Sequence, residues 1–394
     1  SEKPEGEARL LSILVNKLGD PQRKVAAKTM HLLQELSSKH PNMQIVIVKE
    51  IQQFMCRPNV SEAAQYYSIL FLNQIFFRKG QDTELAEHVV MFYFEIFKRF
   101  IQEAFDPNQD KKKRKRMFQE NDEKKLSKKK RKELEKRQQE EKIATQNRTR
   151  HLSAILTGIN RAFPYASTQL MVDPSSKKKF LENVDSLFKL THVAPLHTAT
   201  QALAFLFQIV QLEMENKSEN VKKLQNRFYR ALYERMMSKE LWNSQSRLKI
   251  VLNLMFRAMK HDPNPKRVRA FTKRLLQSGM HGSSALSCGT LYLISALSGK
   301  KNLFEAAQEE GEYDPSKRDP IYSNADQTAV WELVMSQNHY HPSVRAFCNQ
   351  MHENGRIKYN GDPLVDFSLK SFLNRFSYRN PKSNRESEED ATRQ

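Results

Sequence analysis

Helix start signals, each followed by an amphipathic segment, recur along this chain and restrict its fold more than any other feature. Asp20 is suited to cap a helix and Pro21 to occupy its first turn, and a His-Pro pair closes the segment at Pro41. A second helix is expected from Asn42 to Met55, and a third behind Ser61 as the next cap. Helix pairs therefore recur about every 40 residues, the period that is typical of HEAT-like arrays.

The same start signal returns later, as NPKRVRAF from Asn264 and HPSVRAF from His341. Glycine is scarce, at 11 of 394 residues, and alternating strand patterns bounded by Asn-Gly or Asp-Gly turns are missing. The sequence therefore predicts an all-α fold, a HEAT-like or armadillo-type α-solenoid of helix pairs into which a basic charged segment is inserted.

Changes in composition divide the chain into four expected parts. Residues 1–108 are expected to form an N-terminal helical repeat lobe, 109–147 a basic charged insertion that is either a long helix or disordered, 148–382 a C-terminal helical lobe, and 383–394 a disordered polar tail. Polar stretches at 172–179 and 308–328 are expected to be loops. The absence of an initial Met and the polar ending favour a fragment of a longer protein.

The charge balance favours a polyanionic partner, because the net charge is +20 and 28% of the residues are charged. Residues 111–142 alone hold 16 Lys and Arg against seven Asp and Glu. This run is a candidate nuclear-localisation signal, a nucleic-acid-binding arm without sequence preference, or a solvated tether. Positions 126, 133, 140 and 147 read Leu, Glu, Glu and Asn, so no leucine zipper follows it. The candidate residues are Lys111, Lys112, Lys113, Arg114, Lys115, Arg116, Lys128, Lys129, Lys130, Arg131 and Lys132.

A second group of cations lies in the C-terminal lobe. Two interpretations stay open for it: the cations line a basic groove that binds nucleic acid, or they cover a solvated helix face. Aromatic residues on the helix after Asp82 pose a similar choice between core packing and base stacking, and their helical spacing favours the core, with Tyr93 and Phe94 as the two that face a partner. The candidate cations are Arg267, Arg269, Lys273 and Arg274.

Patterns that would indicate an enzyme are missing. Neither a GxxxxGK[ST] loop nor a GxGxxG after a strand occurs, and three widely separated cysteines form no CxxC pair. Ser283 and Ser284 are better explained as helix caps than as nucleophiles, and His339 and His341 lack further metal-binding neighbours. We therefore expect no catalysis, no cofactor and no metal, and no apolar run suggests a membrane partner.

Four segments together resemble the CCAAT-binding-factor family of nucleolar complex proteins. They are LTGINRAFPYA, NPKRVRAFTKRLLQ, HPSVRAFCNQM and YNGDPLVDFSLKSFLNRFSYRNPK, and the resemblance runs from about Leu10 to Lys382. It implies a non-enzymatic scaffold in the nucleus and nucleolus, which acts on early precursors of the large (60S) ribosomal subunit. The implied partners are precursor ribosomal RNA, a second nucleolar complex protein and other pre-60S assembly factors.

Two further hypotheses remain beside that scaffold. The family name favours a DNA-binding transcriptional activator at CCAAT-box promoters, although no module for a DNA groove is evident. The solenoid pattern alone would also fit a karyopherin-like transport adaptor.

The last of the four segments gives the most specific local expectations. Gly361 to Pro363 is expected to form a turn into a helix from Leu364 to Phe376, with Asp362 or Asp366 near the positive end of that helix. The apolar residues of this helix are expected to lie in the core. The tail behind it is the candidate docking element, made of Tyr378, Arg379, Asn380, Pro381 and Lys382.

Overall fold

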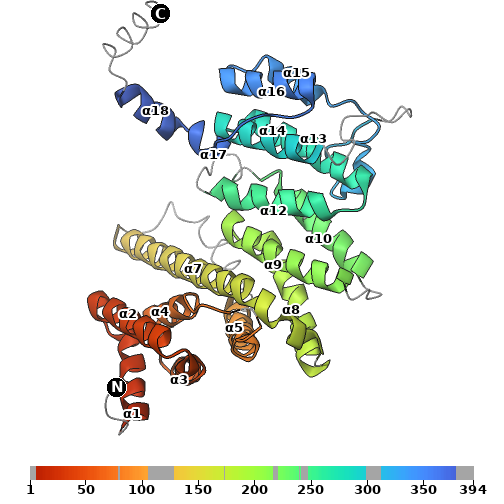
Figure 1. Ribbon diagram of the computed structural model, residues 1–394. Coiled ribbons are helices and arrows are strands. Elements are labelled where there is room, and N and C mark those ends of the chain that lie inside the picture. Colours follow the sequence, from red (N-terminus) through yellow and green to blue (C-terminus); the bar gives the residue numbers. More distant parts are fainter. Residues whose placement is uncertain are drawn as a thin grey trace, which may run out of the picture. The chain divides into compact units, whose positions relative to one another are not determined.

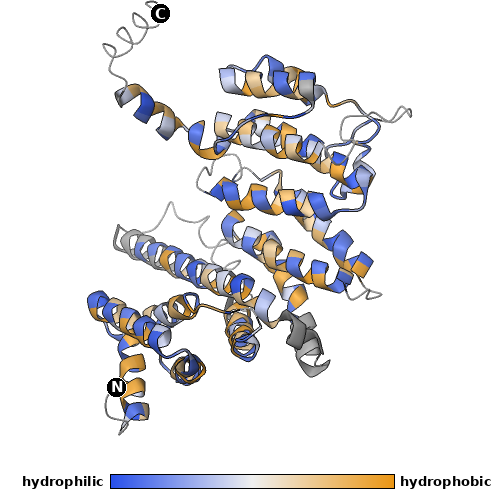
Figure 2. Ribbon diagram, in the orientation of Figure 1, coloured by the Kyte–Doolittle hydropathy of each residue, from blue (hydrophilic) through white to orange (hydrophobic). Residues whose placement is uncertain are grey.

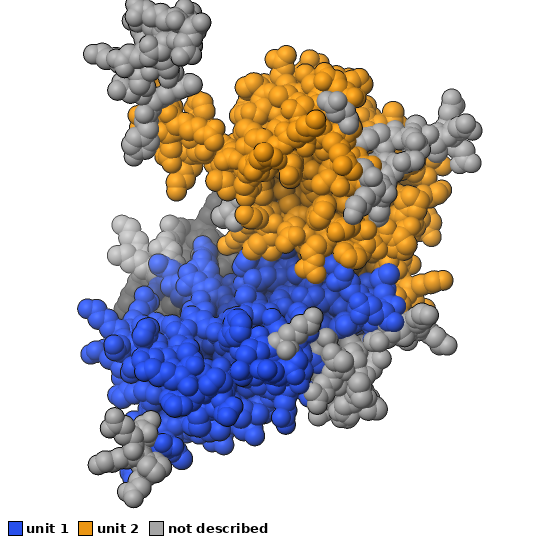
Figure 3. All heavy atoms as spheres, in the orientation of Figure 1, with its two compact units in different colours: residues 1–218 blue, residues 219–394 orange. Residues whose placement is uncertain are grey.

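The computed structural model is built from α-helices (Figure 1). It describes residues 6–78, 80–104, 128–172, 174–215, 221–238, 240, 247–298 and 312–378, and these ranges contain no β-strand. The chain forms two compact units, residues 1–218 and 219–394 (Figure 3). Their boundary lies behind the basic segment that we expected to separate the lobes.

In the first unit, each helix packs on the helix that follows it in the chain or on the one after that. Apolar and polar residues alternate around these helices (Figure 2), as the amphipathic sequence pattern requires. They are α1 (Glu7–Asn16), α2 (Arg23–Lys39), α3 (Gln44–Cys56), α4 (Glu62–Leu72), α5 (Thr83–Ala104), α7 (Lys128–Val172), α8 (Pro174–Val193) and α9 (Leu196–Glu215), with short 3-10 turns η1 (Lys17–Gly19) and η2 (Pro41–Met43).

The core of this unit lies where α5 packs on α7. The aromatic residues of α5 are buried, so the core interpretation is correct, and the idea that Tyr93 and Phe94 face a partner is wrong. Tyr93 is held by its hydroxyl, which donates to Asn73 Oδ1 at 2.5 Å. Gly158 of α7 faces this pair so closely that a Cβ there would lie 2.3 to 2.5 Å from them. Glycine is what lets the two helices approach.

The long helix α7 explains why the unit boundary differs from our expectation. Its first twenty residues come from the charged segment, and they continue without a break into the segment that we assigned to the next lobe. Because α7 packs on α4, α5 and α9, the helices on both sides of the charged segment share one core. The loop expected at 172–179 is also wrong in large part, since α8 begins at Pro174.

The second unit contains two helix pairs, α13 with α14 and α15 with α16, and the helices that flank them (Figure 1). Helical pairs thus build both units, and the expected all-α solenoid class is confirmed. The elements are α10 (Val221–Arg235), α12 (Leu248–His261), α13 (Pro265–His281), α14 (Ser284–Ser298), η5 (Pro320–Ser323), α15 (Trp331–Gln337), α16 (Pro342–Asn354), α17 (Pro363–Asp366) and α18 (Leu369–Tyr378).

Side-chain caps start the helices of this unit where the sequence predicts them. The Asn264 side chain accepts from the main-chain N–H of Lys266, and His341 accepts from that of Ser343. Each cap stands directly before a proline, which has no N–H that needs a partner. Ser283 Oγ accepts from Leu286 N at 3.4 Å at the start of α14, as the cap interpretation requires.

Candidate nucleic-acid interface

Helix α13 carries the four cations for which a basic groove and a solvated helix face were the two open interpretations. Arg267 and Arg274 each lie three and four residues along the helix from the buried Ala270 and Phe271. They therefore share the helix face that packs into the core. Arg267 and Arg274 are each 3% exposed and Lys273 is 1% exposed. A buried cation requires a partner, and each of the three has one.

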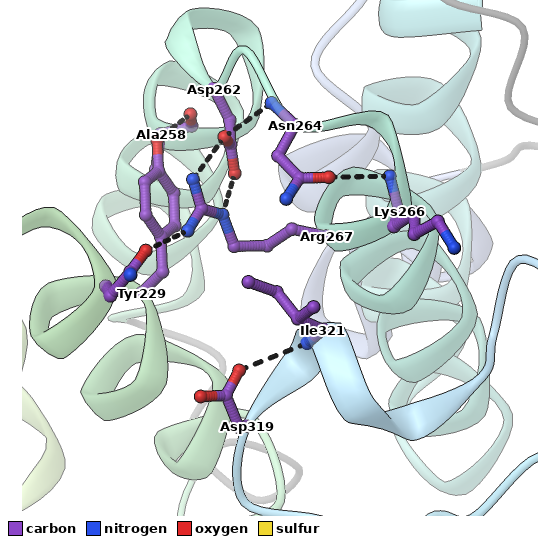
Figure 4. A network of polar contacts seen from close by, with 9 residues as sticks. Tyr229, Ala258, Asp262, Asn264, Lys266, Arg267, Asp319 and Ile321 are labelled. Atoms are coloured by element: carbon purple, nitrogen blue, oxygen red, sulfur yellow. Dashed lines mark hydrogen bonds and ion pairs between the residues drawn. The ribbon is translucent and has the colours of Figure 1, made fainter. Parts of the chain in front are cut away.

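Arg267 forms a closed network with the residues at the start of its own helix (Figure 4). Its guanidinium donates two hydrogen bonds to Asp262, from Nε to Oδ2 at 2.5 Å and from Nη2 to Oδ1 at 2.6 Å. A third bond runs from Nη1 to Asn226 Oδ1 at 2.9 Å, and the group lies 4.1 Å from the ring centre of Tyr229. This bidentate pair neutralises the charge of Arg267 and joins α13 to α10.

Lys273 holds the start of α15 against α13, whereas Arg274 holds the end of α10 and the segment before η5. Lys273 Nζ lies 3.2 Å from the Glu332 carboxylate and donates to the Ala329 carbonyl oxygen at 3.0 Å. Arg274 donates to the carbonyl oxygens of Tyr233 at 3.0 Å and Pro315 at 2.7 Å. These long-range contacts hold both side chains inside the fold, and of the Arg274 guanidinium only Nε has no hydrogen-bond partner among the described residues.

For three of the four cations on α13, both interpretations, the basic groove and the solvated face, need correction. Arg267, Lys273 and Arg274 are internal staples, because carboxylates and carbonyl oxygens of the fold itself take their donors. Arg269 is half-buried and has its own interactions. The sequence could have indicated the buried pair of Arg267, because Asp262 stands only five residues before it. It could not indicate the partners of Lys273 and Arg274, which lie more than 40 residues away along the chain.

The other predicted site residues lie mostly outside the described residues. This holds for Lys111, Lys112, Lys113, Arg114, Lys115 and Arg116, and for Arg379, Asn380, Pro381 and Lys382. Lys128, Lys129, Lys130, Arg131 and Lys132 form the first turns of α7, and Tyr378 ends α18; only the main chain of these residues is described. Their roles stay predictions.

The segment from Gly361 to Phe376 differs from our expectation in its second half. The helix breaks at Phe367 and Ser368, so that α17 and α18 are separate. Phe367 packs between the rings of Phe347 and Tyr359, as expected of a core residue. The apolar face of α18, defined here by Leu369, Phe372, Leu373 and Phe376, is between 51% and 74% exposed, so its assignment to the core is wrong.

The turn before α17 is joined to α12 by a side-chain contact. Asp362 caps α17 by accepting from Leu364 N at 3.1 Å, and Lys249 Nζ of α12 lies 2.9 Å from its Oδ2. The hydrogen bond from Lys249, together with that from Leu364, lowers the pKa of Asp362 below its usual value. Partial burial and the hydrogen bond to Asp366 raise the pKa of Tyr359 to about 12.

Two of the three cysteines are buried in the core. Burial raises the pKa of Cys288 to about 12, and it raises that of Cys348 as well, which makes both thiols poor nucleophiles. In the described ranges, no group of three or more His, Cys, Asp or Glu is arranged to hold a metal ion. None of the helices described there is both long enough and apolar enough to cross a membrane.

The fold and these contacts define a helical-repeat protein whose buried cations hold the repeats together. Residues 199–348 match the CBF/Mak21 family, and the chain therefore contains a domain of that family, which confirms the resemblance noted from the sequence. The matched region runs from α9 to α16 and includes the whole buried cation network of α13.

Curated relatives resemble almost the whole chain. Mouse (Mus musculus) CCAAT/enhancer-binding protein zeta is 32% identical over 450 residues, covering 97% of this chain and 37% of the mouse protein. Ribosome biogenesis protein NOC1 of Chaetomium thermophilum is 31% identical, covering 97% of this chain and 38% of its own length. Nucleolar complex protein 1 of Drosophila melanogaster is 28% identical, covering 96% and 34%. The chain thus spans well under half the length of these relatives.

Proposed function

We propose that this chain is a non-enzymatic scaffold in the biogenesis of the large ribosomal subunit, acting in the nucleus and nucleolus. The observation that carries the proposal is its similarity, over 97% of its length, to a protein named for ribosome biogenesis. Similarity to a protein named as a nucleolar complex component supports the compartment. Helix pairs suit this role, because stacked repeats offer extended surfaces for several partners.

Precursor ribosomal RNA is the polyanion that we propose as the first partner. The net charge of +20 and the six consecutive cations from Lys111 to Arg116 favour binding to phosphates. RNA backbone contacts do not require an element that enters a groove and reads base edges, whereas direct readout of a DNA sequence does.

A second nucleolar complex protein is the proposed protein partner, together with other pre-60S assembly factors. Relatives named as nucleolar complex proteins support membership of such an assembly. We keep the segment from Tyr378 to Lys382 as the candidate docking element, because its first residue ends α18, whose apolar face is exposed.

Crosslinking in living cells tests the RNA part of the proposal. The tagged chain is crosslinked, purified under denaturing conditions, and its bound RNA is sequenced. We expect reads enriched in precursors of the large-subunit ribosomal RNA. Background levels of such reads, equal to those of an untagged control, would contradict the proposal.

Transcriptional activation at CCAAT-box promoters is the alternative, and the name of the mouse relative favours it. Competition binding separates the two functions. If the alternative holds, a CCAAT duplex displaces a labelled CCAAT duplex at physiological salt much better than a scrambled duplex of equal length does. Under the scaffold proposal the two duplexes compete equally.

A further inference from the structure

Unit 1 contains a hollow at the corner between α3 and α4 that the function proposed above does not yet use. Its volume is about 390 Å³, and α5 and α7 close its other sides. Three arginines from three different parts of the chain line it: Arg57 from the corner itself, Arg99 from α5, and Arg148 from α7.

The three guanidinium groups are poorly neutralised by the fold. Arg99 and Arg148 form no hydrogen bond or ion pair with any residue that the structure describes. Arg57 donates to the neutral side chain of Asn16 at 2.7 Å, and its nearest carboxylate oxygen, on Glu50, is 4.0 Å away. This contrasts with Arg267, whose two hydrogen bonds to Asp262 leave no charge for a ligand.

The lining also contains one carboxylate, that of Glu62, which opposes an anion. Its Oε2 accepts from Asn147 Nδ2 at 3.2 Å, and it forms no ion pair with any of the three arginines. Among the charged side chains of the lining, three guanidinium groups thus outnumber one carboxylate. The hollow has a cationic excess that a bound anion would neutralise.

A buried histidine holds the walls of the hollow in place. His151 of α7 is 4% exposed, and its ring nitrogens face the carbonyl oxygens of Asn147 at 2.7 Å and Glu62 at 2.9 Å. Its ring also stacks on Phe100 of α5, with centroids 5.2 Å apart. Because these contacts join α4, α5 and α7, the arginines are presented from a fixed frame, which reduces the entropy that binding would cost.

We infer that Arg57, Arg99 and Arg148 bind backbone phosphates of an RNA strand that lies across the corner between α3 and α4. The inference rests on the proposed RNA-binding function and names a place on the chain where it occurs. Guanidinium groups suit phosphate oxygens because their donors match that geometry, and phosphate contacts position RNA without reading its sequence.

Paired charge-removing variants test the site against nonspecific attraction. The chain of residues 1–394 carries either Arg99→Gln with Arg148→Gln, or the control pair Arg9→Gln with Arg23→Gln. Arg9 and Arg23 are exposed arginines of the same unit that do not line the hollow. Binding of a fluorescein-labelled single-stranded RNA is followed by fluorescence anisotropy over a range of salt concentrations, and thermal melting checks that each variant is folded.

The hollow pair is expected to weaken binding about tenfold and to reduce the slope of log K against log salt by about 0.7 per lost phosphate contact. The control pair should change affinity less than about twofold. Equal losses for the two pairs would overturn the inference while leaving RNA binding, and with it the proposed function, intact. If the unchanged chain bound no RNA, both would fall.

A thiol at the hollow provides a test that needs no arginine variant. Cys56 lines the hollow and is exposed, whereas Cys288 and Cys348 are buried, so alkylation of Cys56 reports whether the hollow is filled. Saturating RNA should slow this alkylation at least fivefold, as read by mass spectrometry of the peptide. Unchanged alkylation with bound RNA would overturn the inference.

Other anions and one further variant complete the design. Inorganic phosphate and a DNA strand of the same sequence show how much of the protection of Cys56 comes from phosphate alone. A poly-glutamate peptide must protect Cys56 less than RNA does, or the RNA assignment fails.

Glu62→Gln removes the opposing carboxylate and retains an oxygen for Asn147. It should strengthen RNA binding severalfold, an effect that a merely structural role of these residues would not produce; weaker or unchanged binding by this variant would count against the site.

Discussion

At the scale of single residues, Arg267 and Arg148 show how surroundings decide what a cation does. Arg267 donates hydrogen bonds to Asp262 and Asn226 inside the molecule. Arg148, in contrast, forms no hydrogen bond or ion pair with the described residues and lines a hollow. Both belong to helical segments rich in basic residues. A count of charges along the sequence treats them alike, because it contains no information on their partners.

Breaking the buried pair on one side should be strongly destabilising. Asp262→Asn leaves the Arg267 charge buried without its counterion, and we expect a loss of about 3–5 kcal/mol in the free energy of unfolding, measured by urea denaturation. As a control, Glu35→Gln removes the exposed ion pair with Lys39 and should leave the urea midpoint unchanged. Similar effects of the two substitutions would show that the Asp262 pair is not a staple.

Gly158 offers a second test at this scale. A methyl group there would collide with Asn73 and with the buried ring of Tyr93, so Gly158→Ala should lower the free energy of unfolding by about 1–3 kcal/mol. Gly279→Ala is the matched control, because Gly279 also lies within a helix but has ordinary distances of 3.6 Å or more around it. The control should be neutral or slightly stabilising, since alanine favours helix.

At the scale of elements, the cap of α17 predicts a pH dependence. The pKa of Asp362 in the folded chain lies below its usual value, mainly through the hydrogen bond from Lys249, so its stabilising contribution is present above about pH 4 and is lost as the pH falls through the lowered pKa. Lys249→Gln should raise the pKa of Asp362 toward its usual value. An NMR titration of the Asp362 carboxyl carbon measures this, and an unchanged pKa would contradict the contact.

Because the apolar face of α18 is exposed, substitutions on it should change the stability of the fold far less than substitutions in a core helix. Phe372→Ser and Phe376→Ser should each change the free energy of unfolding by less than about 0.5 kcal/mol, because both rings are already more than half exposed. Phe367→Ala, whose ring packs on Phe347 and Tyr359, should cost well over 1 kcal/mol in the same urea denaturation series. A large loss for the α18 variants would restore our earlier assignment of this helix to the core.

At the scale of the whole molecule, charge and fold are separable properties. Replacing all six residues from Lys111 to Arg116 by Gln should weaken RNA binding and lower its salt slope by up to about 4, the sum for six single-strand phosphate contacts. The thermal midpoint should stay the same, because the run is expected to lie outside the helical core. An unchanged salt slope would favour the tether or the localisation signal over an RNA-binding arm.

Local signals predicted much of the fold because they act over a few residues. Ser61, Asn264 and His341 cap helices as predicted, since a cap needs only an N–H two or three residues away. Breaks were harder to locate: the sequence indicated one helix where α17 and α18 are separate, and a loop where α8 has already begun. At these points the choice between turn and helix depends on neighbouring elements, such as the rings that hold Phe367.

By itself, the sequence determined the all-α class, the helix starts at Ser61, Asn264 and His341, and the strongly basic character of this protein, because composition, spacing and caps are local quantities. Only the tertiary structure decided which cations are staples and which line a hollow, and that α18 is exposed. Lys273 meets Glu332 across 59 residues, and Arg99 and Arg148 converge from α5 and α7. Such pairings depend on how distant helices pack, and no local pattern encodes them.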